Sequence, residues 1–311
     1  MRWPALAELL RARYRALFWG TISAWPAAIF RVGVALVVLV RTSDVGRSFI
    51  RLDHHGWVQG LEYHPNVEAL VEPALRTPLW PFLPPIGNDL ASGLVYTRTA
   101  LAVVLLFGLA PRLSAGALAL VGYVLMASDR YRYLHHLHLL WVMCAWLAVV
   151  PSGAKLSLAW LLRWKTSKAD VVPRWSIQLV RFQALVIYAA SGLAKLTPGW
   201  LDGTTLALIE KMHLVGGPLW RAALAIGSYR SLSIAILLTE LALPALLVWR
   251  KTRLAGVGLG LALHAGFSLA LIVSTFGLQM ALFLLLFLPW RERWPEPSDA
   301  VQATAESKAL S

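Results

Sequence analysis

The fold of this chain is decided by apolar stretches such as Arg181-Phe-Gln-Ala-Leu-Val-Ile-Tyr-Ala-Ala-Ser-Gly-Leu-Ala-Lys195-Leu-Thr-Pro-Gly-Trp200. The stretch is apolar enough to lie in a bilayer, yet it carries a lysine near its end, just before a Pro-Gly-Trp break. A lysine at membrane depth costs about 2.5–3.5 kcal/mol, so it is usually paired, snorkelling or functional. Where water is excluded, burial favours the neutral amine, which can act as a base. Lys195 is therefore a candidate catalytic base, and a lysine that snorkels to the interface is the alternative.

The composition of the whole chain indicates a membrane protein. Of its 311 residues, 58% are hydrophobic and only 14% are charged, and the mean hydropathy is +0.62. These values exclude an ordinary soluble globular domain. Apolar runs of near-spanning length predict an all-α, polytopic transmembrane helical bundle of about eight spans. The spans are expected at residues 25–41, 92–110, 113–129, 134–151, 175–196, 230–249, 253–273 and 275–290.

The net charge of +13 is distributed as in a membrane protein. Arginine and lysine residues cluster in the short loops between the apolar runs, and no basic-aromatic patch stands apart from them. The sequence therefore predicts no binding to nucleic acid. Eight spans with both termini in the cytoplasm place these clusters on one side, as the positive-inside rule requires. The expected partner is the lipid bilayer, and the expected location is the cytoplasmic (inner) membrane.

One transmembrane domain, residues 25–290, accounts for most of the chain. We expect it to be preceded by a cytoplasmic amphipathic segment, residues 1–24, in which apolar and basic residues alternate at helical spacing. A polar cytoplasmic tail, residues 291–311, should follow it. A further interfacial segment is expected at Thr204 to Ile226, where Gly216-Gly217-Pro218 breaks any long helix.

The outward ends of the fourth and fifth spans carry groups that are suited to proton transfer. The fourth span opens with His135-His136-Leu-His138 and the fifth ends at Lys195, so His136 and Lys195 are expected at one membrane level. Histidine can donate, accept or shuttle protons beside a buried base. His136 is thus a second candidate catalytic residue, and histidines that simply lie at the interface are the alternative. No third ligand with suitable spacing accompanies these histidines, so no metal site is predicted.

Further polar groups fall within apolar spans. Glu240 and His264 each lie in the middle of a span, where polar groups are costly. Each is therefore expected to face the bundle interior and to find a partner there. The candidate counter-charges for Glu240 are three arginines, Arg31, Arg98 and Arg181, and a buried ion pair of purely structural role is the alternative. Gln183 adds a polar group to the lysine-bearing span.

These residues carry a resemblance to a known family. The run from Arg181 through Gly192-Leu-Ala-Lys195-Leu to Trp200-Leu-Asp-Gly203 resembles the membrane core of vitamin K-dependent γ-carboxylases. It is equally similar to the wider bacterial group of HTTM (horizontally transferred transmembrane) proteins. His135-His136-Leu-His138 resembles the Asn-His-x-x-Leu element of the carboxylases, and His264 resembles another family element. At the family's Ser-x-Asp element this chain has Ser157, but Ala159 stands in place of the aspartate.

The resemblance implies a chemistry for these residues. Lys195 would be the base that deprotonates a reduced quinone (vitamin K hydroquinone-like), with His136 as the second catalytic residue near the outward face. The protein would then be a quinol-dependent, γ-carboxylase-like membrane enzyme that modifies a secreted peptide or protein. The candidate cofactor-binding residues are His138, Gln183, Glu240 and His264.

Two other functions remain open at this point. One is a non-enzymatic membrane partner for the maturation or export of a secreted peptide, as in proteins that resemble the sporulation-delaying-protein B group. The other is a transporter or a structural subunit of a larger complex. Internal repeats with broken helices are typical of transporters, and no convincing repeat occurs in this sequence.

Overall fold

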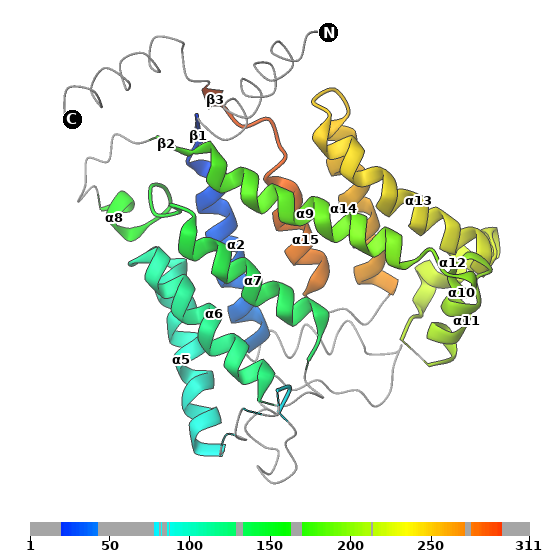
Figure 1. Ribbon diagram of the computed structural model, residues 1–311, viewed down its shortest axis with the longest axis horizontal. Helices are drawn as coiled ribbons and strands as arrows, with labels where there is room; N and C mark the ends of the chain where they lie inside the picture. Colours follow the sequence, from blue (N-terminus) through cyan, green and yellow to red (C-terminus); the bar gives the residue numbers. More distant parts are fainter. Residues whose placement is uncertain are drawn as a thin grey trace.

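The computed structural model describes residues 20–42, 78–80, 82, 86, 88–128, 133–162, 170–212, 214–270 and 275–293. Within them, each of the eight predicted apolar segments forms a helix (Figure 1). The prediction of a helical bundle is confirmed, whereas the predicted amphipathic segment and polar tail lie almost entirely outside the described residues. The eight helices are α2 (Trp25–Thr42), α5 (Asn88–Leu106), α6 (Pro111–Ala127), α7 (His135–Val149), α9 (Arg174–Ala194), α13 (Tyr229–Val248), α14 (Arg253–Ala270) and α15 (Phe276–Leu285).

Four of these helices are long and apolar enough to cross a bilayer, judged by length and composition: α5, α9, α13 and α14. The other four, α2, α6, α7 and α15, have apolar segments of 10–17 residues. A helix rises about 1.5 Å per residue, so about 20 residues cover the hydrocarbon core of a bilayer. The helices support a membrane protein, and the crossing of all eight stays a prediction.

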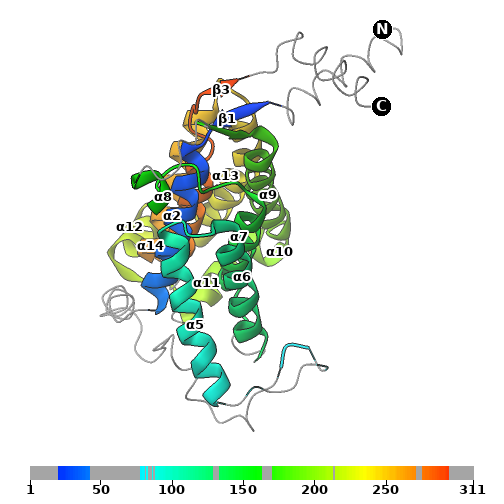
Figure 2. The ribbon, with the colours of Figure 1, turned by 90° about the vertical axis from the view of Figure 1, so that its left-hand side faces the viewer.

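The helices pack as two groups of neighbours around one core (Figures 1 and 2). Helices α2, α5, α6 and α7 form the first group, α9, α13, α14 and α15 form the second, and α15 packs on α2 between them. At this junction Phe30 lies against Phe283, with ring centroids 5.6 Å apart. Gly33 of α2 lets Leu282 of α15 approach so closely that a β-carbon at position 33 would overlap it. Aromatic packing and a close helix contact thus join the two groups.

A three-stranded sheet closes one end of the bundle (Figure 1). Its central strand, β1 (Thr21–Ser23), is antiparallel to β2 (Val171–Pro173) on one side and to β3 (Glu292–Arg293) on the other. The middle residue of β1, Ile22, is fully buried. The short helix α8 (Leu158–Leu161) lies at the same end. The all-α prediction did not include this sheet, because strands of two or three residues leave no alternating pattern to detect.

Three short helices lie at the far end of α9 from the sheet and are here called the helical cap: α10 (Pro198–Leu201), α11 (Thr204–Lys211) and α12 (Gly217–Ile226). Helix α9 ends at the predicted break, where Thr197 is extended (φ −121°, ψ 150°), as a residue before proline prefers. The predicted break before α12 is also confirmed. Gly217 has φ 91°, a left-handed conformation that favours glycine.

Candidate functional site

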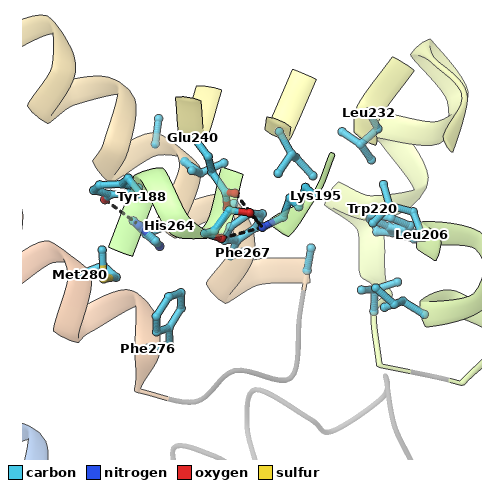
Figure 3. A pocket seen from close by; sticks show the side chains of 18 of the residues that line it. Tyr188, Lys195, Leu206, Trp220, Leu232, Glu240, His264, Phe267, Phe276 and Met280 are labelled. Atoms are coloured by element: carbon cyan, nitrogen blue, oxygen red, sulfur yellow. Dashed lines mark hydrogen bonds and ion pairs between the residues drawn. The ribbon is translucent and has the colours of Figure 1, made fainter. Parts of the chain in front are cut away.

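A cavity of about 520 Å³ lies between the end of α9 and the helical cap (Figure 3). Helices α7, α13, α14 and α15 complete its wall. Most of the lining is apolar, including side chains such as Leu206, Leu232 and Met280. Its volume lies within the range of small-molecule sites, about 300–1,000 Å³. The polar side chains that line it are His135, His136, Tyr188, Ser191, Lys195, Glu240 and His264.

Lys195 and Glu240 form an ion pair in the wall of this cavity (Figure 3). The Nζ of Lys195 donates to Glu240 Oε2 at 2.7 Å and to Ser191 Oγ at 2.7 Å. It also lies 5.1 Å from the centre of the Trp200 ring, which is a cation–π distance. The Lys195 side chain is 19% exposed and the Glu240 side chain 6%. The lysine therefore points to a carboxylate inside the bundle instead of snorkelling away from it.

Helical spacing and a small residue bring this pair together. Ser191 precedes Lys195 by four residues, so the two side chains lie on one face of the chain at the end of α9. Gly192 lets α13 approach α9 closely, because a β-carbon there would come within 2.6 Å of Leu241 Cδ2. Glu240, the residue before Leu241, thereby reaches Lys195 from the neighbouring helix.

The partner of Glu240 is thus Lys195, which was not among the three candidate arginines. Arg31 instead donates from Nη2 to the backbone carbonyl of Leu156 at 2.7 Å. Arg181 pairs with Glu292 of β3 at 3.2 Å. Arg98, the third candidate, lies with its guanidinium carbon 6.0 Å from the centre of the Trp141 ring of α7. Arg31 and Arg181 are engaged toward the sheet end of the bundle, away from the cavity.

A second polar pair lines the same cavity. The Tyr188 hydroxyl and His264 Nε2 are 2.8 Å apart, and both side chains are buried. The His264 ring packs edge-on against Phe267 and Phe276, with centroids 5.9 and 5.3 Å away. Its Nδ1 has no hydrogen-bond partner in the part of the chain that the structure describes. Buried ring nitrogens normally have a partner, so this atom is unusual among the described residues.

The structure brings four of the six predicted site residues to this one cavity: Lys195, Glu240, His264 and His136. His136 lines the cavity from the first turn of α7. Among the long helices, α7 comes directly before α9 in the chain. The expectation that His136 and Lys195 share one membrane level stays a prediction. Catalytic roles for these residues stay predictions.

The other two predicted site residues do not line the cavity. His138 follows His136 by two residues, a rotation of about 200° around the helix. Its ring packs against the rings of Tyr123 and Tyr133, with centroids 5.9 and 5.8 Å away. Gln183 lies about 120° around the helix from the direction of Lys195, and its side chain is half-buried.

Sequence reasoning did not single out two cavity residues, Tyr188 and Trp220. Tyr188 precedes Lys195 by seven residues, close to two full helical turns, so the helical phase alone places both on one face. Trp220 lies on α12 and had no such signal, because only the folding of the cap brings it to the cavity. The Trp220 Nε1 is buried and has no acceptor among the described residues.

A tight turn holds the helical cap beside the ion pair. The Asp202 carboxylate accepts a hydrogen bond from the Thr204 backbone N–H at 2.8 Å, which holds the pKa of Asp202 below its ordinary value. Gly203 between them has φ 88°, and a side chain there would overlap the backbone at the start of α13. Trp200 donates from Nε1 to the Ser233 carbonyl of α13 at 2.9 Å. The cap is thus anchored to α13 on both sides of the turn.

The arrangement is suited to moving protons in an apolar environment. An amine, a carboxylate and a phenol–imidazole pair share one cavity, where electrostatic interactions are stronger than in water. Among the described residues, no group of three or more His, Cys, Asp or Glu side chains is placed to hold a metal ion.

Comparison with known proteins identifies the family. The family model described as the HTTM domain matches residues 64–294, well over half of the chain. This range contains every cavity-lining residue named above and all the long helices except α2. No curated protein and no solved structure matches the chain. With this match added to its apolar helices, the chain belongs to the HTTM family.

Proposed function

We propose that this HTTM protein is a membrane enzyme that takes a proton from a lipid-soluble, hydroxyl-bearing molecule such as a reduced quinone, with Lys195 as the base. The observation that carries the proposal is the Lys195–Glu240 pair, at 2.7 Å, in the wall of an apolar cavity of about 520 Å³. An ion pair of purely structural role is best satisfied where side chains pack closely around it. This pair instead borders a space that is large enough for a ligand.

The pair can supply a neutral base without leaving an isolated charge. In an apolar environment the neutral form, amine and carboxylic acid, lies closer in free energy to the charged form than it does in water. Transfer of a proton from Lys195 Nζ to Glu240 Oε2 along their hydrogen bond leaves an amine. The amine accepts the proton of the substrate hydroxyl, and the resulting ammonium lies beside the substrate oxygen anion. The site with its substrate is neutral before and after this transfer, so no charge has to be desolvated alone.

The residues present fit a reduced quinone. His264 Nδ1 and Trp220 Nε1 are buried without partners among the described residues and would hold ligand oxygens. Phe267 and Phe276 offer aromatic surfaces. A bound reduced quinone would supply an acidic hydroxyl and the reducing equivalents for a reaction with O2. His136 lines the same cavity and would pass protons toward the proposed outward face.

We also propose that the chain crosses the cytoplasmic membrane eight times, with both termini in the cytoplasm. The sheet supports this layout, because β1, β2 and β3 share one end and therefore require an even number of crossings between them. Four apolar helices lie in each of the two intervals. Basic residues gather toward the sheet end, as the positive-inside rule requires of a cytoplasmic side. The cavity then lies near the outward face, where a secreted peptide or protein is the expected target of the modification.

The test is quinol consumption by the purified protein in lipid nanodiscs with O2 supplied, with the quinone epoxide measured by mass spectrometry. Lys195→Ala should lower the rate by about 10²-fold or more, the usual effect of removing a general base. The matched control is Lys211→Ala, which removes the same group at the exposed end of α11, outside the cavity. This control should keep the wild-type rate.

Absence of epoxide from folded, quinol-saturated wild-type protein would overturn the enzyme proposal. The non-enzymatic function would then take its place, with the cavity as a binding site for a segment of a secreted peptide. Co-purification of such a peptide with the wild type, and its loss in Lys195→Ala, would support that function.

A further inference from the structure

A second cavity, of about 610 Å³, is lined by residues of α6, α8 and β2 at the sheet end of the bundle. In Figure 1 this end of the bundle lies opposite to the helical cap. The wall of the cavity is formed by the start of α6, the segment from Pro151 to Trp160 that includes part of α8, and strand β2. The proposed reaction does not use this second cavity, so a role for the second cavity does not depend on the proposed function. The lining residues that matter for it are Arg112, Leu113, Ser152, Ser157 and Trp160.

Two serines, Ser152 and Ser157, and a cation line this second cavity. Arg112, in the first turn of α6, is exposed at its edge. The Ser152 side chain is buried, with 1% of the residue exposed, and its hydroxyl has no partner among the described residues. A buried hydroxyl without a partner is unusual and indicates that a ligand or water belongs there. None of the described lining residues is acidic, and Asp170, next to β2, is paired with Lys155.

A buried cation lies directly behind this wall. Arg31 of α2 is fully buried, and it donates from Nη2 to Leu156 O at 2.7 Å. Its Nε and Nη1 have no acceptor in the part of the chain that the structure describes. Gly108 separates it from Ser157 of the cavity wall: a β-carbon on Gly108 would overlap both the Arg31 guanidinium and Ser157 Cβ. Because a buried charge is normally compensated, the positive field of Arg31 favours an anion in the cavity.

The backbone around the cavity is held in a costly conformation. In the described part of the chain, the non-glycine residues with positive φ are Ala110 (42°) and Leu156 (52°). Both lie in loops of the cavity wall, and these loops are tied together by the hydrogen bond from Leu158 N to Phe107 O at 2.8 Å. Such conformations are energetically costly and are concentrated at functional sites.

We propose that this cavity binds the phosphate of an anionic phospholipid headgroup, between Arg112 and Ser152. The rest of the lining is mainly apolar and includes the ring of Trp160, and its other serine, Ser157, already accepts a hydrogen bond from Trp160 N. Such a lining suits a lipid better than a free phosphate ion. Leu113, which is 77% exposed, continues this apolar lining onto the outer face of α6, where an acyl chain can lie. The cationic surroundings, with no carboxylate among the described lining residues, favour phosphatidylglycerol over zwitterionic phosphatidylcholine.

The test is native mass spectrometry of the purified full chain in detergent, titrated separately with phosphatidylglycerol, phosphatidylcholine and inorganic phosphate. We expect phosphatidylglycerol to bind more tightly than phosphatidylcholine, by a factor of about five or more. This factor is the effect of about one cation on an anionic headgroup. Arg112→Gln should reduce the affinity for phosphatidylglycerol about fivefold, and Ser152→Ala should reduce it severalfold. Arg291→Gln, an exposed cation at the same end outside the cavity, is the matched control and should change nothing.

Equal binding of the two lipids, or an unchanged affinity in both Arg112→Gln and Ser152→Ala, would overturn the proposal. Displacement of the bound lipid by inorganic phosphate at equal concentration would also overturn it, because the site would then take free phosphate. Arg112 is exposed, so its substitution should leave folding intact. Thermal unfolding of each variant without added lipid checks this directly.

Discussion

Replacement of Glu240 by glutamine would leave Lys195 with a neutral partner of the same size. Removal of one member of a fully buried ion pair typically costs about 3–5 kcal/mol, because the other charge is left uncompensated. Lys195 is 19% exposed and keeps its hydrogen bond to Ser191 and its contact with Trp200. We therefore expect Glu240→Gln to lower the free energy of unfolding by about 2–3 kcal/mol, less than for full burial. The measurement is equilibrium unfolding by SDS titration from detergent micelles, followed by circular dichroism.

A double-mutant cycle separates the pair from the effects of each side chain alone. With Lys195→Met added to Glu240→Gln, no charge is left without a partner, so the double variant should lose less stability than the sum of the two single variants. We expect a coupling energy of about 2 kcal/mol, within the range for contacting residues. Additivity within about 0.5 kcal/mol would refute the ion pair as the structure shows it.

Two further predictions concern the surroundings of the pair. Tyr188→Phe removes the hydrogen bond to His264 and should cost about 1 kcal/mol in the same SDS titration, whereas Tyr96→Phe, at an exposed tyrosine of α5, should cost nothing measurable. The pKa of Asp202 is held below its ordinary value, about 3.9, so its hydrogen bond to Thr204 stabilises the turn above that pH and is lost as pH falls through the lowered pKa. Protection of the Thr204 amide against hydrogen exchange should therefore decrease in acid, and Asp202→Asn should abolish this pH dependence; an unchanged profile in the variant would contradict the assignment.

The long helices could be predicted because each is a continuous apolar run. For α9 the expected range, 175–196, differs from Arg174–Ala194 by two residues or fewer at each end. The sheet could not be predicted, because Thr21–Ser23 and its partner strands are too short for a period of two to be recognised. Strand pairing between residues that are 148 or more positions apart also has no local signal in one sequence.

The candidate site was predictable where a polar side chain interrupts an apolar run. Lys195, Glu240 and His264 stand out for this reason, and all three line the cavity. The identity of the pair was not predictable, because the two partners lie 45 residues apart on different helices and arginines were equally available by sequence. The helical phase of α9 also indicates that Tyr188, and not Gln183, lies on the same face as Lys195.

The sheet also has a consequence for how the chain is made. Glu292 of β3, which binds the buried Arg174 and Arg181 of α9, lies 111 residues after Arg181. At about 5–20 residues per second, Arg181 waits roughly 6–22 s after its own synthesis for its counter-ion. During that time the central strand β1 has β2 on one edge only, and the two arginines of α9 lack their carboxylate. β3 follows the last helix, α15, so the sheet is completed only after that helix has been made. A chain that ends before residue 292 therefore leaves one edge of β1 open and leaves Arg174 and Arg181 without the carboxylate of Glu292.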